Sequence, residues 1–221
     1  MTRIWNGRRN AVYGVLAIAG LLSIAQASFA AGRSETEELV AQLGCPQCHG
    51  AAGISSDPAI PSLAGQKYDY LLRQISVFRQ TYIAGPDRVP VTTRAHPVMS
   101  RLSREMTPDQ MQDIARHYSL LSCGPAPTVS PPPGAAPAGV DRCEVCHGGK
   151  RTNPWRDTPY ISAQSETYLY RTIRGLAGAI QTPEAPHERY HRLSEIMFDS
   201  DPDTILRAYA AYYAHLSCTP R

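Results

Sequence analysis

Apolar residues recur at three- and four-residue spacings in several stretches of this chain, which is the period of a helix with one buried face. The clearest stretches are Tyr68–Thr81 and Glu166–Ala177. A shorter helix is expected over Glu35–Leu43, because Ser34 can cap its first turn and acidic side chains follow at once. No stretch alternates convincingly between apolar and polar residues as a strand would. The pattern therefore predicts an all-α fold.

Two further helices are marked by the residues that start them. Thr107-Pro108-Asp109 and Asp201-Pro202-Asp203 each place a capping side chain directly before an early proline. The helices that follow are expected to run to Tyr118 and Tyr213.

The chain contains one unit written twice. Cys45-Pro-Gln-Cys48-His49-Gly50 recurs 98 residues later as Cys143-Glu-Val-Cys146-His147-Gly148. The same offset maps five further residues onto their copies: Pro61 onto Pro159, Gln66 onto Gln164, Arg73 onto Arg171, Ile75 onto Ile173, and Met99 onto Met197. After the methionine the offset falls to 95, where Leu121-Ser122-Cys123 matches Leu216-Ser217-Cys218. We predict two homologous domains, residues 31–123 and 140–221, joined by a proline-rich linker at 124–139.

Residues 1–30 have the layout of a secretory signal. A basic start is followed by an apolar run over Ala11–Ala25, and small residues at Ser28 and Ala30 precede a cleavage point after Ala30. An uncleaved anchor is the alternative, but the run of about 15 residues is shorter than the roughly 20 that cross a bilayer. The mature protein is therefore expected in the periplasm.

The charge balance argues against a polyanion as partner. The whole chain has a net charge of +3, and its signal segment contains Arg3, Arg8 and Arg9 but no acid. The rest therefore carries 22 − 3 = 19 basic groups against 19 acidic groups. Such a neutral chain has no electrostatic footprint for nucleic acid, and we expect none to bind.

The two Cys-x-x-Cys-His motifs indicate covalent haem. Two thiols at this spacing can add to the two vinyl groups of one haem, and the adjacent histidine then reaches the iron. Zinc ribbons place their cysteine pairs closer in sequence, thioredoxin-like pairs need a βαβ unit, and a disulfide needs no histidine beside it. We predict two covalently bound haem c groups, one at Cys45, Cys48 and His49 and the other at Cys143, Cys146 and His147.

A methionine in each repeat is the candidate for the sixth iron ligand. Met99 and Met197 each follow the motif histidine by 50 residues. A thioether favours reduced iron and raises the reduction potential. Alternatives remain in both repeats. Met106 competes in the first, and His187 and His191 compete in the second, where a histidine would give a bis-histidine haem of lower potential.

A proline follows each motif histidine at the same separation, Pro61 after His49 and Pro159 after His147. A carbonyl near either proline could accept the second ring N–H of the histidine and fix its orientation. A proline that only forms a turn is the other reading.

With these residues in place, the chain from about residue 35 to 221 resembles the tandem di-haem cytochromes of the cytochrome c4 family. The resemblance rests on the haem motifs, the methionines, the terminal Ala-Tyr-Tyr helix, and the stretches Pro61–Gln66 and Pro159–Gln164. It implies two class-I cytochrome c domains related by an approximate two-fold axis, with the haems near their interface. It also implies periplasmic electron transfer in a respiratory chain, often toward a terminal oxidase. The chain departs from the family around residues 180–200.

Four cysteines are assigned to haem, which leaves Cys123 and Cys218 at equivalent helix ends. Free exposed thiols tend not to persist in an oxidising compartment. If the two domains pack around a pseudo-two-fold axis, equivalent positions can meet, and we predict a Cys123–Cys218 disulfide. Buried thiols and links to another chain are the alternatives.

The function expected from these features is that of an electron carrier with no catalytic residues. It would pass single electrons between periplasmic or membrane-bound redox proteins in transient complexes. The first alternative is a permanent electron-accepting subunit of a periplasmic dehydrogenase, such as one that oxidises a sulfur compound or an alcohol. The second is catalysis at the second haem, which would need an exchangeable sixth position.

Overall fold

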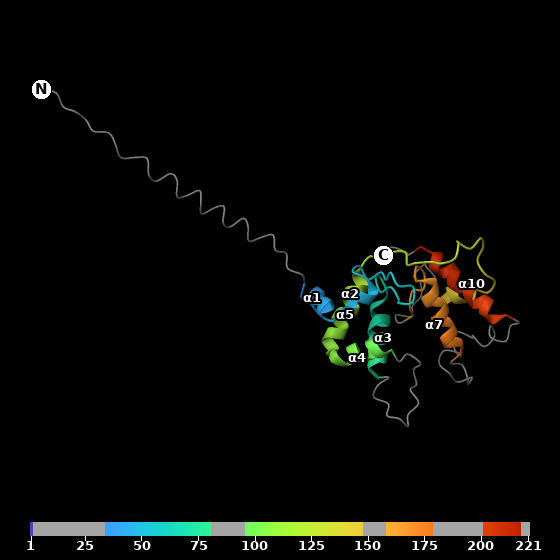
Figure 1. Cartoon of the computed structure of the whole chain (residues 1–221), viewed down its shortest axis with the longest axis horizontal. Coiled ribbons are helices and arrows are strands. Elements are labelled where there is room, and N and C mark those ends of the chain that lie inside the picture. Colours follow the sequence, from blue (N-terminus) through green and yellow to red (C-terminus); the bar gives the residue numbers. More distant parts are fainter. Residues whose placement is uncertain (2–33, 81–95, 148–157, 179–200, 218–221) are drawn as a thin grey trace. The chain divides into compact units, whose positions relative to one another are not determined.

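The computed structural model describes residues 1, 34–80, 96–147, 158–178 and 201–217. The chain divides into two units, Met1–Ser34 and Glu35–Arg221, and the fold described below is that of the second. Its helices are α1 (Glu35–Gln42), α2 (Cys45–His49), α3 (Tyr68–Gln80), α4 (Pro97–Glu105), α5 (Pro108–Leu120), α6 (Asp141–His147), α7 (Glu166–Gly178) and α10 (Pro202–His215) (Figure 1). The described residues contain no strand, so the all-α prediction is confirmed for them.

The first repeat has an apolar core built by three helices. Val40 of α1, Leu71 of α3 and Tyr118 of α5 are among its buried residues, each at most 6% exposed. These positions lie on the apolar faces that the sequence pattern predicted, and α3 packs against both α4 and α5. The core therefore forms directly below the first cysteine motif, because Cys45 packs against it.

Side-chain caps set where α5 and α10 begin. The Thr107 hydroxyl accepts the Gln110 backbone N–H at 3.2 Å, and the Gln110 side chain accepts the Thr107 backbone N–H at 2.9 Å. This capping box satisfies two N–H groups that the helix itself leaves unpaired. At α10 the Asp201 carboxylate accepts the Thr204 N–H at 3.3 Å. Both predicted helix starts are confirmed.

The described residues of the second repeat form an apolar core of their own, and α10 packs along α7 within it (Figure 1). Val140, Tyr209 and Tyr213 form the buried centre. The two tyrosines also hold the end of the proline-rich segment, because Tyr209 donates to the Ala138 carbonyl at 2.8 Å and Tyr213 to the Val140 carbonyl at 3.4 Å. The segment before α6 is thus hydrogen-bonded to the second repeat.

The same segment has a second attachment at Ser130. The Ser130 backbone N–H and hydroxyl donate to the two Glu166 carboxylate oxygens at 3.1 and 2.8 Å. Glu166 begins α7, so one carboxylate joins the linker to the start of a helix.

Helix α4 was not predicted, and it carries Met99 in its first turn. His96 caps this helix, and Pro97 occupies its first position.

In the part of the chain that the structure describes, no helix is long and apolar enough to cross a bilayer.

Candidate haem sites

The first cysteine motif forms a single helical turn, α2, between two glycines with positive φ angles. Gly44 precedes it with φ 71°, and Gly50 follows it with φ 81°. A side chain at Gly50 would be impossible without rearrangement, because its Cβ would lie 2.0 Å from the Ile54 carbonyl oxygen. This close approach explains why a glycine follows the motif histidine in this fold.

The orientation of each motif histidine is fixed by one carbonyl. Nδ1 of His49 lies 2.9 Å from the Pro61 oxygen, and Nδ1 of His147 lies 2.9 Å from the Pro159 oxygen. A carbonyl only accepts, so Nδ1 carries the proton and Nε2 keeps the lone pair that can bind a metal. The prediction of an orienting carbonyl is confirmed in both repeats.

His49 is also kept neutral by its surroundings. It is 8% exposed, and burial lowers its pKa, although the bond to Pro61 acts in the opposite direction. The neutral ring is the form that binds iron.

The first cysteine of each motif is half-buried beside a tyrosine at the same place in the repeat. Burial raises the pKa of Cys45 and of Cys143, while the neighbouring Tyr118 and Tyr213 side chains, respectively, act against this rise. Burial also raises the pKa of both tyrosines. The buried Tyr118 hydroxyl has no hydrogen-bond partner among the described residues.

The start of α4 is the part of the first repeat that could supply a sixth ligand. Met99 is half-buried there, and its backbone N–H donates to Nδ1 of His96 at 3.4 Å. His96 in turn lies close enough to His49 to lower the pKa of His49. The neighbouring Ser100 hydroxyl is buried and has no hydrogen-bond partner among the described residues.

Met106, the competing methionine, is placed differently. It is 4% exposed and packs in the apolar core of the first repeat. This environment suits a methionine that fills space. The candidates in the second repeat, Met197, His187 and His191, lie outside the described residues.

These residues fit a covalently attached haem. None of the four motif cysteines is in a disulfide, although an oxidising compartment would favour pairing them. Each motif histidine has Nδ1 hydrogen-bonded to a carbonyl, and its Nε2 would be the atom that holds the iron. A haem bound here supplies an iron that changes oxidation state by one electron.

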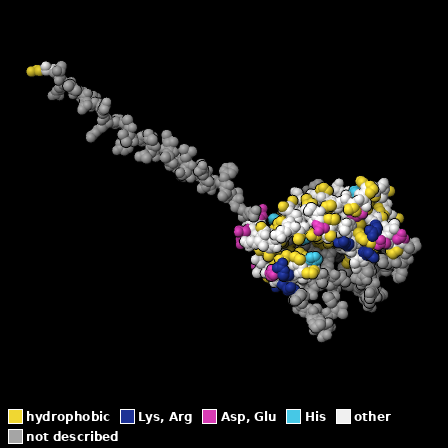
Figure 2. Space-filling model, viewed as in Figure 1, with side chains coloured by type: hydrophobic (Ala, Val, Ile, Leu, Met, Phe, Trp, Pro, Cys, Tyr) yellow, Lys and Arg dark blue, Asp and Glu magenta, His cyan; other side chains and the backbone are white. Residues whose placement is uncertain are grey.

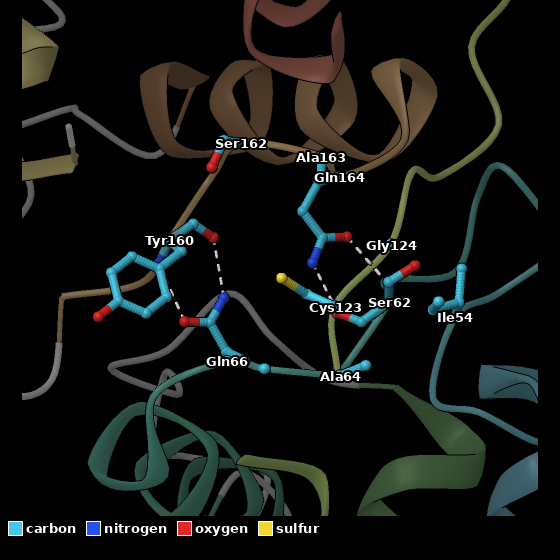
Figure 3. A pocket seen from close by; sticks show the side chains of 11 residues that line it. Ile54, Ser62, Ala64, Gln66, Cys123, Gly124, Tyr160, Ser162, Ala163 and Gln164 are labelled. Atoms are coloured by element: carbon cyan, nitrogen blue, oxygen red, sulfur yellow. Dashed lines mark hydrogen bonds between the residues drawn. The ribbon is translucent and has the colours of Figure 1, made fainter. Parts of the chain in front are cut away.

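The two repeats meet through a reciprocal exchange of glutamine side chains (Figure 3). The Gln164 amide accepts the Ser62 N–H at 3.0 Å and donates to the Ser62 carbonyl at 2.6 Å. The Gln66 amide accepts the Tyr160 N–H at 2.9 Å and donates to the Tyr160 carbonyl at 2.8 Å. Ser62 and Tyr160 are equivalent positions in the two repeats, as are the two glutamines. The contact is therefore self-complementary, as a two-fold axis requires.

A small cavity lies beside this exchange, and Cys123 borders it (Figure 3). Cys123 is disulfide-bonded, so the alternative of a buried free thiol is wrong for this residue. Its predicted partner, Cys218, lies outside the described residues.

The charged side chains on the drawn face are mixed in sign, with Lys and Arg next to Asp and Glu (Figure 2). One such group joins α7 and α10. Asp203 accepts from Arg207 at 2.9 Å, lies 3.9 Å from Arg174 and accepts from the Tyr170 hydroxyl. This agrees with the balanced charge of the sequence.

Comparison with known proteins places this architecture. Residues 34–118 match the family model described as Cytochrome c. The chain is 27% identical over 169 residues to cytochrome c4 of Thiocapsa roseopersicina, covering 68% of this chain and 78% of that protein. It is 27% identical over 216 residues to the thiosulfate dehydrogenase electron acceptor of Thiomonas intermedia (strain K12), covering 90% of each. The fold matches that of reduced recombinant cytochrome c4 from Pseudomonas stutzeri with a TM-score of 0.63 and 24% identity, over 85% of this chain and 100% of that chain.

Residues 34–118 are thus a cytochrome c domain, and the fold is that of tandem class-I cytochromes. Over most of its length the chain is similar to electron-carrying c-type cytochromes, among them cytochrome c4.

Proposed function

We propose that this chain carries two covalent haem c groups and passes single electrons between periplasmic redox proteins. One haem is attached at Cys45 and Cys48 with His49 as ligand, and the other at Cys143 and Cys146 with His147 as ligand. Met99 and Met197 are the proposed sixth ligands. The observation that carries the proposal is the hydrogen bond from each motif histidine to a proline carbonyl, at 2.9 Å in both repeats.

The rest of the proposal concerns processing and domain limits. The signal is cleaved after Ala30, and two cytochrome c domains follow at residues 31–123 and 140–221, with the linker at 124–139. A Cys123–Cys218 disulfide joins their ends. In the chain-entropy model, closing a loop of about 95 residues contributes on the order of 4 kcal/mol.

The chain's own residues prepare the sites for electron transfer. The Pro61 and Pro159 carbonyls hold the ligand rings in one orientation, so little rearrangement accompanies a change of iron charge. Burial of His49 and Tyr118, with Cys45 half-buried, keeps water from one side of the first site. The protein makes and breaks no bond during transfer.

A thiosulfate-oxidising dehydrogenase is the proposed electron donor. Support comes from the relative named as a thiosulfate dehydrogenase electron acceptor, to which the similarity extends over 90% of both chains. The acceptor is a second redox protein on the path to a terminal oxidase. In the first alternative, the dehydrogenase would hold this chain as a permanent subunit.

Stopped-flow spectroscopy tests this role. Oxidised holoprotein is mixed with thiosulfate alone, with thiosulfate dehydrogenase alone, or with both. Haem reduction is expected only with both. Reduction by thiosulfate alone would instead make this chain the enzyme, and no reduction in any mixture would reject this donor. Binding of carbon monoxide by the reduced protein would reveal an open sixth position and favour catalysis at the second haem.

A further inference from the structure

The peptide group that orients each motif histidine also forms a hydrogen bond with a glutamine side chain of the opposite repeat. The Pro61 carbonyl and the Ser62 N–H belong to one planar amide whose electrons are delocalised. Nδ1 of His49 donates to the oxygen of this amide at 2.9 Å. The N–H of the same amide, on Ser62, donates to the Gln164 side-chain oxygen at 3.0 Å. A continuous hydrogen-bonded chain therefore runs from the first motif histidine to a side chain of the second repeat.

The second motif histidine has the same arrangement in reverse. His147 donates to the Pro159 carbonyl at 2.9 Å, and the N–H of that amide, on Tyr160, donates to the Gln66 oxygen at 2.9 Å. Each histidine is thus connected to the glutamine of the other repeat and not to the glutamine of its own.

We propose that Gln164 and Gln66 are positioning residues that tune the haem of the opposite repeat. The proposal rests on the proposed function, because it requires a haem iron on each histidine. An acceptor on the N–H side of an amide makes its carbonyl oxygen more negative, since hydrogen bonds in a chain polarise one another. A more negative oxygen draws the Nδ1 proton and makes the ring a stronger donor to iron. A stronger donor stabilises oxidised iron and lowers the reduction potential.

The burial and geometry of the junction support this reading. Gln66 and Gln164 are 6% and 8% exposed, so their amides exchange little with water. The two sites are unequal in one respect. The Gln66 oxygen also accepts the Lys67 N–H at 3.0 Å, whereas the Gln164 oxygen accepts from Ser62 alone among the described residues. The influence of Gln164 on the first haem is therefore expected to be the larger.

Gln164→Met and Gln66→Met in the full holoprotein test the proposal. Methionine keeps the length of the side chain and removes the amide. Ser165→Ala is the matched control, because it removes another contact across the same junction, Ser165 to the Pro58 carbonyl at 2.5 Å, and leaves the orienting amide untouched. The potential of each haem is followed by NMR of the haem methyl signals. A Met99→Leu holoprotein assigns these signals to the first haem.

Gln164→Met should raise the potential of the first haem and leave that of the second unchanged. Gln66→Met should raise the potential of the second haem by a smaller amount. The proposal is overturned if each variant shifts the haem of its own repeat, if both haems shift equally, or if Ser165→Ala gives the same shift as Gln164→Met. Gln164→Asn, which withdraws the amide by one methylene, replaces Gln164→Met if that variant does not fold and should also raise the first potential.

The wild-type protein separates the two claims. A wild type without two haems defeats the proposed function. If the wild type carries two haems but neither glutamine substitution changes a reduction potential, only this inference is rejected.

Discussion

Gly65 and Ala163 occupy the same left-handed turn in the two repeats, with φ values of 69° and 57°. Each lies directly before the glutamine that crosses to the other repeat. The second copy thus places an alanine in a conformation that favours glycine, which shows how strongly the junction requires this turn.

Gly65→Ala should destabilise the protein by more than the roughly 1–2 kcal/mol of the left-handed conformation alone. Its Cβ would lie 2.8 Å from the Cys123 Cβ, so the disulfide-bonded segment would also have to move. Thermal unfolding followed by circular dichroism measures the effect. Ala163→Gly is the control and should be near neutral, because relief of strain is offset by the entropy of an unfolded glycine. Equal effects of the two changes would contradict this account.

Thr107→Ala should cost about 1 kcal/mol of unfolding free energy, because it removes half of the capping box at α5. Thr107→Ser keeps the hydroxyl and should cost much less. Denaturant titration compares the two. An alanine variant as stable as the serine variant would show that the cap contributes nothing.

Asp203 should make stability depend on pH in the acid range. Hydrogen bonds from Tyr170 and then Arg207 lower the pKa of its carboxyl below the unfolded value. The stabilisation is therefore present above about pH 4 and is lost as the pH falls through the lowered pKa. Asp203→Asn should lower the melting temperature slightly at pH 7 and make no difference well below that pKa. A difference that persists in strong acid would assign the effect to packing.

Met99→Leu should abolish the long-wavelength sulfur-to-iron absorption of the first haem, whereas Met106→Leu should keep it. Met106 lies in the apolar core, so its replacement by leucine should cost less than about 1.5 kcal/mol. Optical spectroscopy of the two oxidised holoproteins decides between the candidates. Loss of the band in Met106→Leu alone would make Met106 the ligand.

The sequence predicted the elements whose signal is local. The spacing of apolar residues located α3 and α7 within one or two residues of their ends, and the Thr-Pro-Asp and Asp-Pro-Asp starts located α5 and α10. The equal sequence separation of the motif histidine and a proline in both repeats indicated an orienting carbonyl but left open a proline that only forms a turn. These features depend on neighbours along the chain.

Features that depend on distant partners were missed. Helix α4 is short, and it has few apolar residues among serine and arginine, although these few share one face. It begins at a cap from His96. The exchange of Gln66 and Gln164 follows from the packing of the two repeats. The repeat offset indicated that the two glutamines occupy equivalent positions. It could not reveal that each side chain forms hydrogen bonds with the backbone of the other repeat.

The most direct test of the central claim is mass spectrometry of peptides from the mature, secreted protein. The account predicts one haem on the peptide containing Cys45 and Cys48, and one on the peptide containing Cys143 and Cys146. Haem on only one of these peptides, or on neither, would contradict it.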